Sequence, residues 1–376
     1  MKTLRLVVLA ALFLAACSNT GSGAVSSTTP TASTSPSAKP ADTKAANLRV
    51  QLDLLLAEHV MVVAKQATAA TNHSDEYAGY LTLLTANGAS LVDVMRAAFG
   101  NTAASQFEQA WAVQDGNLID YTIGLVTHNE NKSNGAMSGL LNGFVPQFAQ
   151  LIASLTQLPV NSTTQLETAD LTYAKTMIDD EVAQSYTKLY VDVRSAYANS
   201  SLIGDGLAVR MAQQFPDKFP GDPSISAVDA RVALNGLLQE HSYLATMTSD
   251  AVIGGRAAEE AAALGALAAN RHDLGPVLTF LLGPGVGAPF DELWGTRVAD
   301  LVGYASSADP GAKSRLTGTF VSQFTALAPA PAAAVRDQVV ATLKVTDDQR
   351  AKALQQVAGD DRAAAAAMRA IADGID

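Results

Sequence analysis

Apolar residues recur at intervals of three and four positions along two long segments of the chain, as they do on one face of an α-helix. One stripe runs Leu52, Leu55, Leu56, His59, Val62 and Val63, and the other runs Leu234, Leu237, Leu238, His241, Leu244 and Ala245. Alanine and leucine are plentiful, aromatic residues make up only 6% of the chain, and strand-like alternation is absent. The pattern therefore predicts an all-α protein.

The two segments begin with the same phrase. RVQLDLLLAEH, residues 49–59, returns 182 positions later as RVALNGLLQEH, residues 231–241. At an offset of 183 the match continues in order, pairing Asn87 with Asn270, Leu91 with Leu274, Gly100 with Gly283, Phe107 with Phe290, Trp111 with Trp294 and Tyr121 with Tyr304. So many pairs in fixed order exceed chance, and they predict a tandem duplication.

A proline-rich break separates the two copies. The stretch FPDKFPGDPS, residues 215–224, holds three prolines, which interrupt helices. The sequence thus predicts two tandem antiparallel helical bundles, at 45–220 and 225–376, each with four or more helices.

Local signals place some elements within the copies. The second helix of the first copy is expected from about Tyr77 to Phe99, and it should end at Gly100 because glycine can take the left-handed conformation. A polar loop is expected at residues 131–135. Phe107 and Trp111 lie four positions apart on the third helix and are expected to pack in the core.

The N-terminal segment MKTLRLVVLAALFLAAC has the features of an export signal. Lys2 and Arg5 precede an apolar run that is too short to span a membrane, and Leu14-Ala15-Ala16 leads into Cys17. This ending resembles the lipobox of bacterial lipoproteins, which implies a signal peptide at residues 1–16 and a lipid such as palmitate on Cys17. The alternative is an ordinary secreted protein in which Cys17 falls there by chance.

The following segment, 17–44, is rich in serine, threonine and proline and predicts a flexible tether. The expected location is the extracytoplasmic face of the cell membrane or outer membrane, with the lipid on Cys17 as the membrane attachment. Cys17 is the only cysteine, which leaves no disulfide for the folded part. The formal charge of −11, without a basic cluster, excludes nucleic acid as a good partner.

The repeated Glu-His pairs are the candidate chemistry. Glu58-His59 and Glu240-His241 sit at equivalent places on apolar stripes, so the imidazoles are candidate ligands for copper or iron, with the glutamates beside them. The alternative is a core histidine that bonds a polar partner, for which Asn87 and Asn270 are the candidates.

Other chemistry has little support in the sequence. His73, His128 and His272 are expected on loops or solvated helix faces. The chain holds no Glu-x-x-His, which excludes the usual di-iron bundle, and no Gly-x-Ser-x-Gly, phosphate loop or dinucleotide fingerprint. No cofactor is assigned by the sequence.

Several short motifs resemble a helical domain of bacterial proteins that has no settled activity. They are Glu58-His59, Asn87 with Leu91, Phe99-Gly100, and the run Gln214-Phe215-Pro216-Asp217-Lys218-Phe219. The resemblance implies a helical fold. Members often have a further histidine on the third helix, where this chain has Gln114 and Arg297, and this departure weakens a metal site.

Two functional hypotheses follow. The first is a non-enzymatic, membrane-anchored lipoprotein that binds an envelope protein or small ligand, or serves as a scaffold, with the groove between the copies as the expected binding place. The second is a metal-binding bundle that uses His59 and His241.

Overall fold

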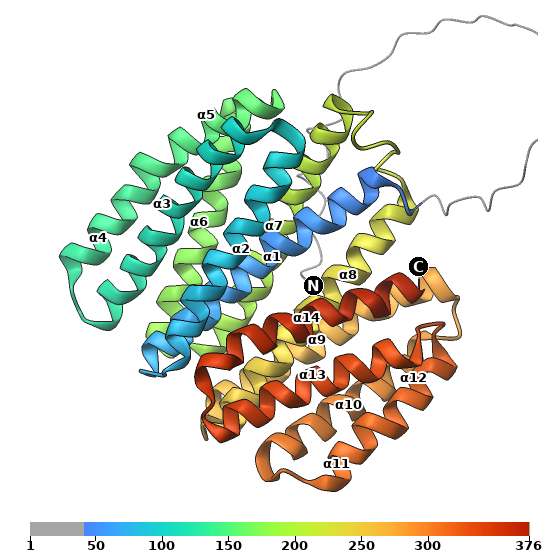
Figure 1. Cartoon of the computed structure of the whole chain (residues 1–376). Helices are drawn as coiled ribbons and strands as arrows, with labels where there is room; N and C mark the ends of the chain where they lie inside the picture. The colour runs from blue at the N-terminus through green and yellow to red at the C-terminus, as the bar shows by residue number, and fades with distance from the viewer. Residues whose placement is uncertain (1–40, 376) are drawn as a thin grey trace, which may run out of the picture. The chain divides into compact units, whose positions relative to one another are not determined.

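The computed structural model describes residues 41–375, and in this range every regular element is a helix (Figure 1). The first half, residues 44–220, holds α1 (Lys44–Thr71), α2 (Glu76–Phe99), α3 (Asn101–Val126), α4 (Glu130–Ser138), the π-helix η2 (Gly139–Phe144), α5 (Val145–Thr156), α6 (Val160–Val182) and α7 (Tyr186–Gln214). The second half, residues 225–375, holds α8 (Ser226–Ile253), α9 (Ala257–Leu282), α10 (Gly287–Ser307), α11 (Pro310–Ser314), the π-helix η3 (Arg315–Phe320), α12 (Val321–Leu327), α13 (Ala332–Ala351) and α14 (Leu354–Ile375). The predicted all-α class is confirmed.

Local sequence explains where several helices begin and end. The Thr43 side chain accepts a hydrogen bond from the Ala46 amide at the start of α1, which satisfies one of the free N–H groups there. Gly100 and Gly283 end α2 and α9 with positive φ values of 86° and 98°, a region that favours glycine.

The polar loop predicted at residues 131–135 is wrong, because these residues belong to α4. Asn129 caps this helix by accepting a hydrogen bond from the Lys132 amide. Ser133 is buried, and its backbone lies so close to Gly124 of α3 that a side chain at Gly124 would collide with it. The polar composition of this segment therefore does not indicate the helix α4, which is stabilised by its N-cap and by close packing on α3.

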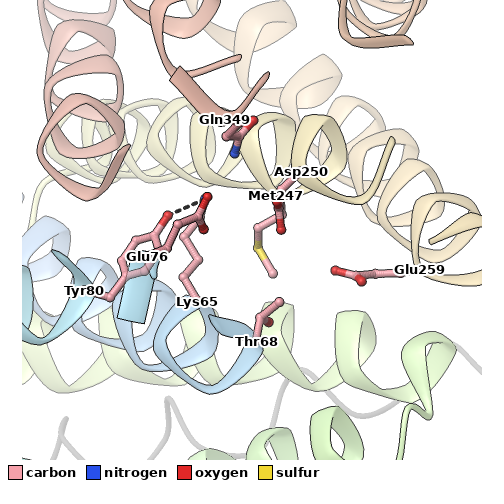
Figure 2. A pocket seen from close by; sticks show the side chains of 8 residues that line it. All are labelled: Lys65, Thr68, Glu76, Tyr80, Met247, Asp250, Glu259 and Gln349. Carbon is pink, nitrogen blue, oxygen red and sulfur yellow. Dashed lines mark hydrogen bonds between the residues drawn. The ribbon is translucent and has the colours of Figure 1, made fainter. Parts of the chain in front are cut away.

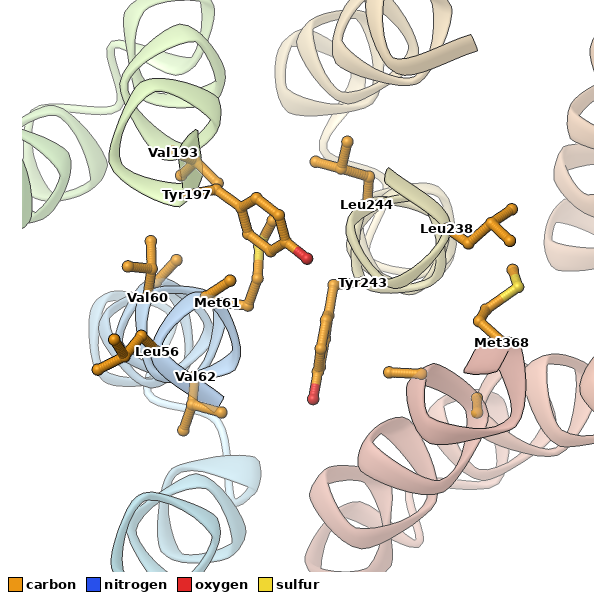
Figure 3. Packing of buried hydrophobic residues seen from close by; sticks show 14 of the residues in the cluster. Leu56, Val60, Met61, Val62, Val193, Tyr197, Leu238, Tyr243, Leu244 and Met368 are labelled. Carbon is orange, nitrogen blue, oxygen red and sulfur yellow. The ribbon is translucent and has the colours of Figure 1, made fainter. Parts of the chain in front are cut away.

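The helices α1 and α8 are the central elements of the fold. Residues 56–70 of α1 are buried on every side, which goes beyond the one-faced stripe that the sequence indicated. The reason is that α1 is covered by α2, α6 and α7 of its own half and by α8 of the other half. Tyr197 of α7 and Tyr243 of α8 lie between the central helices and their neighbours (Figure 3).

Packing between the halves is reciprocal. The last helix of the first half, α7, packs against α9, which is the second helix of the second half. Likewise α14, the last helix of the second half, packs against α2, the second helix of the first half. Such an exchange of equivalent surfaces is what a two-fold relation between similar units produces.

Each half also encloses the same aromatic cluster. Trp111 stacks on Phe107 and contacts Phe148, with ring centroids 5.3 and 6.0 Å apart. Trp294 stacks on Phe290 and contacts Phe324, with ring centroids 4.9 and 5.6 Å apart. The expected core role of these rings is therefore confirmed, and in both halves a π-helix, η2 or η3, ends directly before the helix that carries the last phenylalanine.

The predicted boundary falls between α7 and α8, at residues 215–225. The described residues nevertheless belong to one compact unit, because both halves contribute to the same core cluster. The division into two domains and the duplication itself stay predictions from the sequence, and the matching clusters agree with them.

Two glycines of α7 provide a test of the contact between α7 and α1. A Cβ at Gly204 would lie 2.1 Å from Asp53 Oδ1 and 2.9 Å from the Asp53 amide nitrogen, whereas a Cβ at Gly206 would meet nothing within 4 Å. Gly204→Ala is expected to lower the free energy of unfolding by about 2 kcal/mol. Gly206→Ala should leave it equal or raise it by up to about 1 kcal/mol, because alanine is the better helix former. Urea unfolding of both variants measures this, and equal effects would contradict the close contact.

Candidate functional site

Glu58 of α1 is buried among hydrogen-bond donors from both halves. Its Oε2 accepts from Asn87 Nδ2 of α2 at 2.8 Å and lies 3.1 Å from Arg362 Nη2 of α14. Its Oε1 accepts from the Tyr243 hydroxyl of α8 at 3.0 Å. The carboxylate is therefore paired with a cation from the other half.

Glu240 of α8 has the same arrangement in reverse. Its two carboxylate oxygens accept from Arg194 of α7 at 2.9 and 3.2 Å, and Oε2 also accepts from Asn270 Nδ2 at 2.7 Å. Arg194 also donates to Asp273 of α9 at 2.8 Å. The residue of α2 that corresponds to Asp273 is Ser90, and its hydroxyl accepts a hydrogen bond from Arg362 at 3.1 Å. Each half thus sends an arginine from its last helix to the first and second helices of the other half.

Asn87 and Asn270 hold the glutamates in place. Both amides are fully buried, and besides the glutamates they donate to the carbonyl oxygens of Leu55 and Leu237, each at 2.9 Å. The predicted polar partners therefore lie in the core, where both amides donate to the glutamates and the backbone, and the Asn270 side chain is also hydrogen-bonded to His241. The bond between asparagine and glutamate explains why Glu and Asn recur together in the two copies.

His59 and His241 lie against the tryptophans and have different partners. His59 Nε2 lies 2.9 Å from Asp115 Oδ1, and the ring centroid is 5.0 Å from that of Trp111. His241 Nδ1 accepts a hydrogen bond from Trp294 Nε1 at 3.0 Å. Burial, together with the nearby charge of Arg297, holds the pKa of His241 well below its usual range, so this ring is neutral.

Gln114 and Arg297, which stand where the similar bacterial domain often has a histidine, are both buried. Gln114, His59 and Asp170 are among the residues that line a small cavity. This cavity has room for about one water molecule. Arg297 lies over the ring of Trp294 at 4.7 Å and donates to Gln338 Oε1 at 2.6 Å. The surroundings of the two histidines are therefore not equivalent.

Within residues 41–375, no group of three or more histidine, cysteine, aspartate or glutamate side chains is placed to hold a metal ion. The four residues predicted as ligands are engaged in the contacts described above. His73, His128 and His272 are exposed, as expected. Cys17 lies outside the described residues, and along the described part no helix is both long and apolar enough to cross a membrane.

A second polar cluster joins the halves beside these glutamates. Buried Lys65 of α1 lies 2.6 Å from Asp361 of α14 and 2.9 Å from the Thr246 hydroxyl of α8. Asp361 also accepts from Thr246 at 2.6 Å and from Tyr80 at 3.1 Å, so its carboxylate is satisfied although it is completely buried. The ion pair therefore connects α1 to α14 without an unpaired charge.

Next to this ion pair is a cavity with room for about one water molecule. Side chains from α1, α2, α8, α9 and α13 line it (Figure 2); they are Lys65, Thr68, Glu76, Tyr80, Met247, Asp250, Glu259 and Gln349. Burial, and then the charge of Asp250, raise the pKa of Glu76 to about 8 against the opposing charge of Lys65. Burial, and then the charge of Glu259, raise the pKa of Glu181 to about 7.

Arg194, Arg362, Lys65 and Asp361 were not predicted from the sequence. The two arginines lie 168 positions apart, so they align only when the offset is changed after the region where the copies differ in length. Lys65 and Asp361 have no charged counterpart in the repeat, and no sequence signal marks them.

Comparison of the chain with models of protein families, with curated proteins and with solved structures finds no significant match.

Loss of Arg194 should be costly, because it leaves Glu240 buried with only its amide partner. Arg194→Met is expected to lower the free energy of unfolding by about 3 kcal/mol. Arg96→Met serves as a control, since Arg96 pairs with Asp93 at the surface and should change stability by less than about 1 kcal/mol. Chemical denaturation measures both variants, and a cost for Arg194→Met no larger than that of the control would refute the structural role of this pair.

The raised pKa of Glu76 predicts a pH dependence of stability. Glu76 binds its proton more tightly in the folded chain than in the unfolded chain, so stability should fall as the pH rises from about 4.5 to about 8. The charged groups that act on Glu76 are Asp250, Lys65, Asp361 and Arg256.

Glu76→Gln should flatten this decline in urea unfolding at pH 6 and pH 8.5, whereas Glu108→Gln at an exposed position should not. An unchanged slope in Glu76→Gln would show that Glu76 is ionised in the folded chain at neutral pH.

Proposed function

We propose that this protein is a lipoprotein of a bacterial cell envelope that acts as a binding or scaffold protein and has no enzymatic activity. The main support for this proposal is that the carboxylates of the repeated residues Glu58 and Glu240 form ion pairs between the two halves. Residues that would otherwise be the best candidates for chemistry therefore hold the fold together.

The sizes of the two described cavities agree with this role. Each has room for about one water molecule, which is too small for an organic substrate. We expect a partner of this protein to meet its outer surface, because neither of these two cavities could hold one. The sequence favoured a groove between the halves as the binding place. The structure makes this place less suitable, because α1 and α8 pack directly against each other and hydrogen bonds cross between the halves.

The anchoring part of the proposal rests on the N-terminal sequence. Lys2 and Arg5, the short apolar run and Cys17 have the order and spacing of a lipoprotein signal. The tether that follows would hold the helical body some distance from the membrane surface, on the extracytoplasmic side of the cell membrane or outer membrane.

Metabolic labelling with an alkyne fatty acid tests the anchor in a bacterial host. The wild-type chain should incorporate the label and sediment with membranes, and Cys17→Ser should lose the label and be released into the soluble fraction. Cys17→Ser that stays with the membrane would contradict lipid anchoring. Turnover of a substrate by the purified chain, abolished by a point substitution, would contradict the non-enzymatic role.

A further inference from the structure

The C-terminal ends of α2 and α9 are built alike but are covered differently. Both helices end at a glycine with positive φ, and both carry the buried asparagine that bonds the neighbouring glutamate. At an offset of 183, Ala97 corresponds to Phe280, Ala98 to Leu281, and Phe99 to Leu282.

The end of α2 is capped by the segment after α7, residues 215–219. Lys218 Nζ donates to the carbonyl oxygens of Ala97 and Ala98 at 3.2 and 2.7 Å. Phe215 lies edge-on to Phe99, with ring centroids 5.4 Å apart, and Lys218 Nζ is 4.8 Å from the centroid of Phe215. One aromatic residue and one lysine thus satisfy both the apolar surface and the last carbonyl groups of the helix.

The end of α9 lacks this cover in the described part of the chain. Phe280 is 65% exposed, the Gly283 amide donates to the carbonyl oxygen of Thr279, and within residues 41–375 no side chain donates to the carbonyl oxygens of Phe280 and Leu281. Leu281 is half-buried where its counterpart Ala98 is 1% exposed, and Val277 is half-buried where its counterpart Val94 is 4% exposed. An apolar surface therefore adjoins a helix end whose carbonyl groups favour a cation.

The chemistry of this surface matches that of the segment that covers α2. The negative end of the helix dipole attracts a lysine or arginine, and exposed Phe280, beside the half-buried Val277, Leu281 and Leu282, offers an apolar surface for an aromatic ring. The predicted tether of this chain, residues 17–44, contains no aromatic residue. An acidic chain also favours a basic partner.

We propose that the end of α9 is a docking site for a partner protein that presents an aromatic–lysine segment of the type Phe-Pro-x-Lys-Phe. This names a partner for the binding role proposed above and rests on that role, but it does not depend on the lipid anchor. The site is the surface formed by Val277, Phe280, Leu281 and Leu282 together with the carbonyl groups of Phe280 and Leu281.

A peptide from the chain itself is the direct probe. A fluorescein-labelled peptide of residues 212–221 is titrated with the full chain, and fluorescence anisotropy reports binding. The wild-type chain should bind the peptide, and Phe280→Ala should weaken binding at least tenfold. Val340→Ala, at an apolar position of α13 that is 51% exposed, should bind as the wild type does. A peptide with the Lys218→Met substitution should bind more weakly.

Amide chemical shifts identify the surface that the peptide occupies. Peptide addition should shift the signals of Phe280 to Gly283 and leave those of Ala97 to Gly100 unchanged, because the latter are already capped. Absence of saturable binding, or equal binding by Phe280→Ala, would overturn the proposal. Sedimentation that shows a dimer of this chain dependent on Phe280 would also overturn it, since the surface would then join two copies. Each of these results is independent of the fatty-acid labelling of Cys17.

Discussion

The structure depends on a reciprocal exchange of arginine between its halves. Arg194 and Arg362 lie on the last helix of each half, and each pairs with a buried glutamate on the central helix of the other half. An asparagine donates a hydrogen bond to each of these carboxylates. A buried carboxylate without its cation is costly, so neither half can satisfy its central helix alone. This constraint explains why two copies of one phrase are joined in one compact unit.

The arginine exchange also indicates that the repeated Glu-His pairs have a structural role in the core. A pair of acid and imidazole on an apolar stripe indicates either metal binding or core structure, and the deciding factor is what each side chain meets. Glu58 meets an arginine, an amide and a tyrosine, and His241 meets the indole of Trp294. The second half further departs from the first at Arg297, where the first half has Gln114 beside a small cavity. The side chains around the two histidines therefore differ between the halves.

Much of the fold follows from the sequence, because periodic apolar positions, glycine stops and the offset of the repeat are local signals. The helix from Tyr77 to Phe99, the aromatic clusters and the break after α7 were all predictable in this way. The arginine partners were not, since the spacing of the matched positions changes before α7 and α14 and each charge pair joins one half to the other. The helix at residues 131–135 was also missed, because its stability comes from a cap and from packing on Gly124 rather than from composition.

A double-mutant cycle between Arg362 and Glu58 measures how strongly the arginine of one half stabilises the buried glutamate of the other. The cycle compares the unfolding free energies of the wild type, Arg362→Met, Glu58→Gln and the double variant. We expect a coupling energy of about 2 kcal/mol, with the double variant more stable than the sum of the single effects implies. A coupling energy within about 0.3 kcal/mol of zero would contradict it, because the two side chains would then contribute independently.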